Sequence, residues 1–260
     1  MGPRSTGSTL TWSSAGQALP RSIPRPSLLR LPGCYQARAD TWLLADTLRH
    51  LKLARGATVL DLCTGTGALA VAAGLDGARD VTATDISNRA TTNAWINGRR
   101  HRIPVRVLRG DLYSALRPDE EFDVVVSNPP YIPSRTRRLS GHAESRCWDA
   151  GPGGRQLLDR ICDETFAWLR PGGSLLLVHS TVSDEGRSVE RLTASGLVVD
   201  IVRREREPFG PVMRARSEML RNRGLIVEGQ DDEELVVIRG TKSVRAWLTT
   251  RNRSRVETST

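Results

Sequence analysis

A short run with strong chemical character, Asn128-Pro129-Pro130-Tyr131, directly follows an apolar stretch over residues 122–127. Asn128 offers a side-chain carbonyl that can accept an N–H, and Pro129 adds a backbone carbonyl, while neither proline has a competing N–H. Two adjacent acceptors suit the two hydrogens of a planar NH2 group, and Tyr131 offers a flat face for stacking. We therefore expect Asn128, Pro129 and Tyr131 to be catalytic, and all four residues to bind a substrate with a conjugated amide or amine nitrogen.

Chemistry at such a nitrogen needs help from the protein, because the lone pair is delocalised. Hydrogen bonds from its N–H groups to Asn128 and Pro129 would favour a tetrahedral attacking geometry and stabilise the positive charge that develops. Alignment with an electrophilic carbon would supply the rest of the rate enhancement. No general base is evident in the sequence, so we expect the proton to leave after the transfer. The alternative interpretation of two prolines after a strand is a simple turn.

A second segment, residues 58–70, combines a strand, two closely spaced glycines and a helix start. Gly65 and Gly67 allow the backbone to turn tightly and to approach a ligand. The helix N-terminus that follows leaves N–H groups suited to a carboxylate, and Asp61 can receive an ammonium group. Ala70 stands where a dinucleotide-binding loop would have its third glycine. The segment therefore predicts a site for an amino-acid moiety, although a lone Gly-X-Gly is also common in ordinary turns.

Two further acids follow the next two predicted strands. Asp85 ends one strand, where a carboxylate can accept both hydroxyls of a ribose, and Asp111 follows the next one, near the expected position of an adenine. Each acid alone could equally be a helix cap. Because the carboxyl ends of parallel strands meet at one edge of a sheet, the joint placement of Asp61, Asp85 and Asp111 favours ligand binding.

Apolar, strand-like runs alternate with helix-like segments from Asp40 onwards. Asp40 is expected to be a helix N-cap, because Leu44, Leu48 and Leu51 then share one helical face. Helical patterns also cover residues 67–75 and 156–169, and Pro171-Gly172-Gly173 is expected to stop the second of these. This alternation predicts an α/β protein with a mostly parallel sheet covered by helices on both faces. The predicted strands are residues 58–62, 81–85, 105–109, 122–127, 174–179, 198–204 and 234–239.

The two ends of the chain differ in composition from its centre. Residues 1–39 contain no Asp or Glu and are rich in Ser, Pro, Arg and Gly, which predicts a disordered extension. Residues 40–240 form the predicted domain, and residues 241–260 are expected to be a tail. Apolar runs are too short to span a membrane, no secretion signal is found, and the four cysteines lack metal-ligand spacing. We therefore expect a reduced cytoplasmic protein that binds no metal and no membrane.

The chain has a formal net charge of +9, which favours an acidic partner such as RNA or the ribosome. This argument is weakened because almost all the positive charge is arginine, with Lys52 and Lys242 the only lysines, a skew typical of coding bias. Arg135, Arg137 and Arg138 follow the Asn-Pro-Pro-Tyr motif directly. Two interpretations of them stay open, a basic rim for RNA or a ribosome-associated protein and a solvated loop.

The glycine loop, the acids after successive strands and the Asn-Pro-Pro-Tyr motif together resemble the class I S-adenosylmethionine-dependent methyltransferases, over roughly residues 40 to 240. The resemblance implies a Rossmann-like methyltransferase fold with a seven-stranded sheet and S-adenosylmethionine as cofactor. In that family the residue after the third acid, here Leu112, covers the adenine ring. The predicted cofactor-binding residues are Thr41, Asp61, Cys63, Gly65, Gly67, Asp85, Ile86, Asp111, Leu112 and Asn128.

The flanks of the motif resemble the HemK/PrmC family, which are release factor glutamine methyltransferases. Ile132-Pro133-Ser134 is similar to that family's extension of the motif, and the stretch over residues 148–158 resembles its block beyond the active-site loop. Residues 35–44, with Asp40-Thr41, resemble the segment that closes over the cofactor in short-form members. The resemblance implies methylation of a glutamine side-chain amide in a peptide-chain release factor or another translation-associated protein.

Two departures from the family pattern affect the expected partners. The stretch before Asp40 is too short and proline-rich for the N-terminal helical domain of the long form, so the chain resembles the short form, some of whose relatives use a small partner subunit. Arg146-Cys147-Trp148 stands where the family has a more apolar sequence directly before the Asp-Ala-Gly block, which affects the substrate contacts expected there. Two other functions stay open: an RNA, less readily a DNA, methyltransferase acting on an adenine or guanine exocyclic amine, and a non-catalytic binding subunit with this fold.

Overall fold

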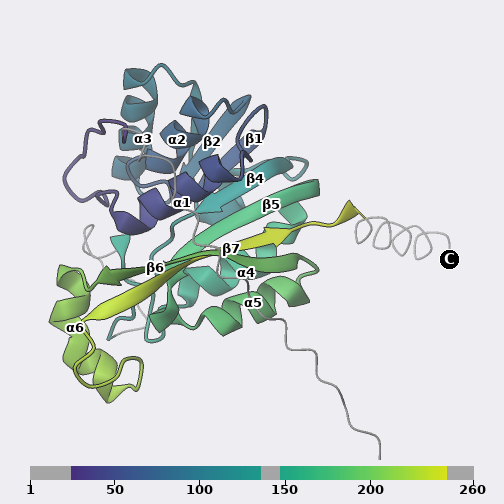
Figure 1. Cartoon of the computed structure of the whole chain (residues 1–260). Coiled ribbons are helices and arrows are strands. Elements are labelled where there is room, and N and C mark those ends of the chain that lie inside the picture. Colours follow the sequence, from purple (N-terminus) through teal and green to yellow (C-terminus); the bar gives the residue numbers. More distant parts are fainter. Residues whose placement is uncertain (1–24, 136–146, 245–260) are drawn as a thin grey trace, which may run out of the picture.

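A seven-stranded sheet forms the centre of the computed structural model, which describes residues 25–135 and 147–244 (Figure 1). The strands run in the order β3-β2-β1-β4-β5-β7-β6, and the strands from β1 to β5 are parallel while β7 is antiparallel to both neighbours. This topology confirms the predicted mostly parallel, Rossmann-like sheet. The strands are β1 Thr58–Leu62, β2 Asp80–Asp85, β3 Val105–Arg109, β4 Phe122–Ser127, β5 Leu169–Ser180, β6 Val198–Pro208 and β7 Asp232–Thr241.

Helices cover both faces of the sheet. Helices α1, α2 and α3 lie on one side of it, α4 and α5 lie on the other, and α6 connects β6 to β7 beyond their ends (Figure 1). No helix in the described part of the chain is both long and apolar enough to cross a membrane. The helices are α1 Ala39–His50, α2 Ala68–Leu75, α3 Asn88–Arg100, α4 Gln156–Trp168, α5 Glu185–Ala194 and α6 Pro211–Asn222, with 3-10 turns η1 Leu112–Ala115 and η3 Thr181–Ser183.

The central strands are buried on both faces, which explains their continuous apolar sequence. In β1 and β4, Val59, Leu60, Val125 and Val126 have no exposed surface. The chain passes from β1 through β2 to β3 on one side, and then returns to place β4 on the other side of β1. Such a reversal opens a crevice at the carboxyl ends of the strands. The glycine loop, Asp85, Asp111 and Asn128 all follow those ends.

The N-terminal expectations need correction. The segment 25–39, predicted to be disordered, is part of the fold: the backbone of Leu29 and Leu31 forms hydrogen bonds with Asn93 and Asn97 of α3. Asp40 is not the N-cap of α1, because the helix already begins at Ala39 with Arg38 in the capping position. The prediction of disorder rested on composition, which indicates how much apolar surface a segment can bury. Composition does not indicate which side chains will form hydrogen bonds with the backbone of the segment.

The boundaries around β5 also differ from the prediction. Helix α4 ends at Trp168, and residues 171–173 lie within β5, where the pairing with β4 shifts register. Gly172 takes a positive φ of 85° and its N–H donates to the carbonyl of Lys242. Lys242, assigned to the tail by sequence, is buried, and its ammonium donates to the carbonyl of Leu169 at 2.6 Å. Thr241 and Lys242 therefore belong to the folded unit, while residues 245–260 and 1–24 lie outside the described residues.

Candidate active site

A cavity of about 370 Å³ lies at the carboxyl ends of β1 to β4, and most of the predicted site residues line it. Two predicted cofactor residues, Asp61 and Gly67, are not in its wall. The structure also brings Tyr35, Leu157 and Arg160 to the wall. From the sequence, Tyr35 and Leu157 were placed only within longer family-like segments, and Arg160 was not singled out. The predicted residues in the wall are Thr41, Cys63, Gly65, Asp85, Ile86, Asp111, Leu112, Asn128, Pro129, Pro130 and Tyr131.

Asp61 lies beneath the glycine loop, not in the cavity wall. Its Oδ2 accepts hydrogen bonds from the Thr64 hydroxyl at 2.6 Å and from the Ala70 N–H at 3.0 Å, and these bonds hold the loop against β1. Its Oδ1 is buried without a hydrogen-bond partner among the described residues. Burial raises the pKa of this carboxyl to about 7. Asp61 was expected to contact a ligand directly. In the structure its Oδ2 holds the glycine loop, and its Oδ1 has no partner among the described residues.

The glycines of the loop adopt conformations that other residues rarely take. Gly65 and Gly67 have φ values of 54° and 79°. A Cβ at Gly67 would come within 2.8 Å of the Cα of Ala94 in α3, so this glycine allows α2 and α3 to pack closely. The N–H of Gly65 donates to Asp85 Oδ2 at 3.0 Å, which joins the loop to the end of β2. Gly67 therefore supports the loop from behind, and Gly65 faces the cavity.

The two further acids differ in their roles. Asp85 accepts from Gly65 and from the N–H of Ser87, and Ser87, rather than Asp85, caps α3. Burial raises the pKa of Asp85. Asp111 both lines the cavity and caps the turn η1, and it forms an ion pair with Arg160 at 2.9 Å. For Asp111, the capping interpretation and the cavity placement therefore both apply.

Asn128 is held by a residue from the start of α1. Its side-chain NH2 donates to the Thr41 hydroxyl at 2.9 Å, and that hydroxyl donates to Asp40 Oδ1 at 3.2 Å. A carboxamide whose nitrogen is fixed in this way also has its carbonyl oxygen fixed, on the opposite side of the group. Because Asn128 lines the cavity, this hydrogen-bond chain orients the acceptor that the motif needs.

Asp40 also holds the other end of the motif. Its Oδ2 accepts from the Tyr131 hydroxyl at 3.1 Å and from the Tyr35 hydroxyl at 2.7 Å. Sequence reasoning missed this role and assigned Asp40 to a cap. The available signal was its spacing, because Asp40, Leu44 and Leu48 follow one another at four-residue intervals on the buried face of α1. A carboxylate on an apolar face needs buried donors, and the two tyrosines supply them.

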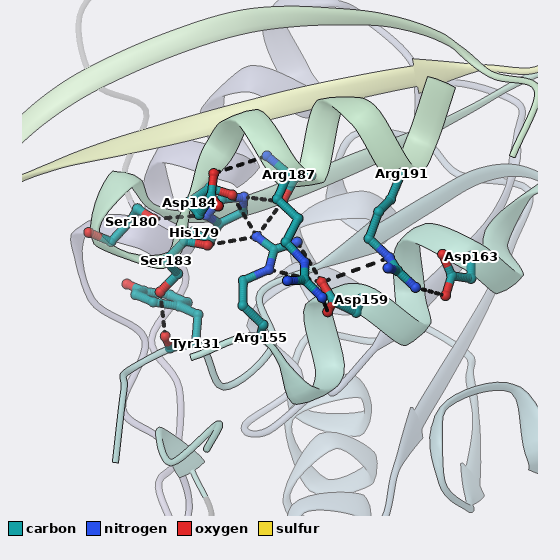
Figure 2. Close-up of polar contacts among 11 residues, drawn as sticks. Tyr131, Arg155, Asp159, Asp163, His179, Ser180, Ser183, Asp184, Arg187 and Arg191 are labelled. Carbon is teal, nitrogen blue, oxygen red and sulfur yellow. Dashed lines mark hydrogen bonds and ion pairs between the residues drawn. The ribbon is translucent and has the colours of Figure 1, made fainter. Parts of the chain in front are cut away.

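A polar network supports the backbone of Tyr131 from behind (Figure 2). The Ser183 hydroxyl donates to the Tyr131 carbonyl at 2.6 Å, and Arg155 donates to the Ser183 carbonyl at 2.7 Å. Arg155 is in turn paired with Asp159 of α4. Gly154 makes this approach sterically feasible, because a Cβ there would lie 2.2 Å from the Tyr131 carbonyl oxygen. The conformation of the motif is therefore fixed by contacts from several elements.

Arginines of the α6 region hold the segments that flank the motif. Arg216 donates to the Pro133 carbonyl at 2.9 Å and pairs with Asp149 at 2.5 Å. Arg223 donates to the carbonyls of Ser134 and Pro152 at 2.9 and 3.0 Å. These contacts join the extension of the motif to the block over 148–154. Arg137, Arg138 and Arg146, which the sequence raised as rim or lead residues, lie outside the described residues.

The chain is similar to known methyltransferases. Residues 34–142 match the methyltransferase small domain. The chain is 39% identical over 155 residues to the release factor glutamine methyltransferase of Bordetella pertussis, with 57% of each chain covered. It is 28% identical to a protein of Methanocaldococcus jannaschii named for N5-glutamine methyltransferase activity, with 70% of this chain and 90% of the relative covered. The chain thus spans little more than half of the bacterial relative and most of the archaeal one.

A solved structure extends the likeness to three dimensions. Mtq2 of E. cuniculi, determined in a complex with Trm112 that is responsible for methylation of the termination factor eRF1, is 25% identical. It superposes with a TM-score of 0.56, covering 81% of this chain and 99% of that one. The mostly parallel seven-stranded sheet agrees with this likeness in fold. The chain therefore carries the methyltransferase small domain and is similar to release factor glutamine methyltransferases of the HemK/PrmC kind.

Proposed function

We propose that the protein transfers a methyl group from S-adenosylmethionine to the side-chain amide nitrogen of a glutamine in a peptide-chain release factor. The observation that carries the proposal is that hydrogen bonds fix both ends of the motif. Asn128 is oriented by Thr41, and the Tyr131 hydroxyl is bound to Asp40. A rigid pair of carbonyl acceptors suits a planar amide. The names of the bacterial and archaeal relatives support glutamine as the target.

The residues around the cavity fit the cofactor. The buried, unpartnered Oδ1 of Asp61 is an atom that an ammonium group can satisfy. The start of α2 offers N–H groups for a carboxylate, and Asp85 can accept from ribose hydroxyls. Asp111 and Leu112 lie in the same wall and would face the adenine. When bound, the cofactor supplies an electrophilic methyl group on a sulfonium sulfur.

The protein's own residues account for positioning and charge stabilisation. The carbonyls of Asn128 and Pro129 accept the two N–H groups of the substrate amide, which orients the nitrogen lone pair and stabilises the positive charge that develops there. The ring of Tyr131 is buried and its hydroxyl is held by Asp40, so the backbone of the motif cannot easily relax away from the substrate. The proton leaves the nitrogen after the transfer.

Partners and location follow from the same proposal. A release factor is the first protein partner. A small subunit that binds the methyltransferase is the second, in the way that Trm112 forms a complex with Mtq2. Translation is the process that brings these proteins together, so we place the reaction in the cytoplasm. The arginine-rich composition leaves RNA as the rival acceptor.

The test offers both acceptors at once. The protein is incubated with methyl-labelled S-adenosylmethionine, release factor and total RNA, with and without a small partner subunit. The RNA and the protein are then separated, and label on the protein is located by peptide mapping. We expect label on a single glutamine of the release factor. Label on RNA alone would overturn the proposed substrate. Cofactor binding without any transfer would instead support a non-catalytic binding subunit.

The cofactor site should also respond to pH through Asp61. Burial raises the pKa of this carboxyl to about 7, so in the free protein it is mostly protonated below that pH and mostly ionised above it. An ammonium group binds the ionised form, so affinity for S-adenosylhomocysteine should rise by up to about tenfold per pH unit below pH 7 and then level off. Calorimetric titration across about pH 6 to 7.5 measures this.

The matched control is Asp61→Asn, which keeps the size of the side chain and removes its charge. Its affinity should be low and nearly independent of pH over the same range. A wild-type affinity that does not change with pH would contradict the assignment of Asp61 to the ammonium group.

A further inference from the structure

Residues 25–38, here called the strap, run along α3 without forming a helix or strand. Asn97 recognises the strap backbone through both of its polar atoms: Leu29 N–H donates to Asn97 Oδ1 at 2.8 Å, and Asn97 Nδ2 donates to the Leu29 carbonyl at 2.9 Å. Asn93, one turn earlier, makes a similar pair of bonds with Leu29 and Leu31. Leu29 itself is 40% exposed, so at this residue hydrogen bonds attach the strap more than apolar burial does.

Asn97 contacts the glycine loop as well. Its Nδ2 donates to the carbonyl of Thr66 at 2.8 Å, and Thr66 lies in the cavity wall between Gly65 and Gly67. The strap forms another part of that wall through Gly33, Cys34 and Tyr35. Asn97 is fully buried and is not itself a wall residue. One side chain therefore joins two walls of the cavity, through Leu29 and Thr66, which lie thirty-seven positions apart in the chain.

We infer that Asn97 is a positioning residue that couples the strap to the glycine loop and thereby sets the affinity of the cofactor cavity. Both N–H donors of its carboxamide and one lone pair of Oδ1 are used. No other common side chain offers two donors and one acceptor in this geometry apart from the longer glutamine. The inference rests on the proposed cofactor site, and it concerns a residue that touches neither cofactor nor substrate.

Two changes test the link from its two ends. Asn97→Ala removes all three bonds, and Leu29→Pro removes the N–H that donates to Asn97 Oδ1. Leu29→Ala is the matched control for the second change, because it shortens the side chain and keeps the N–H. Asn88→Ala, at the exposed start of α3, is the control for the first. We expect Asn97→Ala and Leu29→Pro to raise the dissociation constant for S-adenosylhomocysteine roughly tenfold, and the controls to leave it unchanged.

The decisive measurement is the double variant, studied by calorimetry together with thermal unfolding. If the link acts as inferred, Leu29→Pro has little further effect on affinity once Asn97 is alanine. Additive losses, or a lowered melting temperature with unchanged affinity, would show a merely structural role and overturn the inference. Should Asn97→Ala fail to fold, the Leu29→Pro and Leu29→Ala pair decides alone. Wild-type protein that does not bind S-adenosylhomocysteine would instead refute the proposed cofactor site, and the inference with it.

Discussion

Asn128→Ala is expected to reduce methyl transfer by about a hundredfold to a thousandfold, the cost typical of removing one preorganised group that stabilises developing charge. The change deletes the carbonyl that Thr41 holds toward the substrate amide. Tyr131 stays anchored on Asp40 and Ser183, so the backbone of the motif should keep its conformation. Affinity for S-adenosylhomocysteine should therefore remain near that of the wild type. Single-turnover transfer to the release factor and calorimetric titration measure the two quantities separately.

Asn222→Ala, at the exposed end of α6, provides a control for the loss of an asparagine at a distance from the cavity. It should change neither quantity. Asn128 was also predicted to contact the cofactor. If Asn128→Ala abolished cofactor binding, that contact would be its main role, and the catalytic assignment of the residue would be wrong.

Asp40→Ala is expected to impair both transfer and stability. It removes the acceptor of two tyrosine hydroxyls, Tyr35 and Tyr131, and of the Thr41 hydroxyl that orients Asn128. Each buried hydroxyl left without a partner costs about 1–3 kcal/mol, so the free energy of unfolding should fall by several kcal/mol. Transfer should fall because both ends of the motif lose their support. Urea denaturation and steady-state kinetics measure the two effects.

Two further variants separate the role of Asp40 from general damage to α1. Asp46 lies on the same helix, and its half-exposed side chain forms a long ion pair with Arg49 at 3.7 Å and no other hydrogen bond or ion pair within residues 25–135 and 147–244. Asp46→Ala should therefore be nearly neutral. Asp40→Asn keeps one carbonyl acceptor and should recover part of kcat. Equal loss of activity in the alanine and asparagine variants would mean that the charge of Asp40, and not its hydrogen bonding, matters for transfer.

The strands and the position of the site could be predicted because both depend on local sequence. β1 and β4 begin and end where the sequence predicts, because strands that are buried on both faces need a mostly apolar sequence. The bounds of the edge strand β3 were also predicted, although its residues are only partly buried. The acids and the Asn-Pro-Pro-Tyr motif fall at the ends of those strands, so the topology alone brings them together. Cys63, Ile86 and Leu112 line the cavity for the same reason.

The contacts that hold the site could not be predicted, because they join distant segments. Asp40 meets Tyr131 across ninety-one positions, and Asn97 meets Leu29 across sixty-eight. Neither pair has a local pattern. Asp61 shows the limit in another way: its position at the end of a strand was predicted, but its burial beneath the loop depends on how Thr64 and Ala70 fold back over it.

The prolines of the strap have a consequence for the state in which the strap is detached. A proline restricts φ to one narrow range, so Pro26 and Pro32 reduce the number of conformations that the released chain can sample. Each such restriction lowers the conformational entropy lost on reattachment, by about 0.4–1 kcal/mol where the bound geometry is compatible. The same restriction lowers the entropy gained on release by an equal amount, so the two prolines favour the attached strap over the released one. The prolines therefore help to keep this wall of the cavity in place, together with the hydrogen bonds at Leu29.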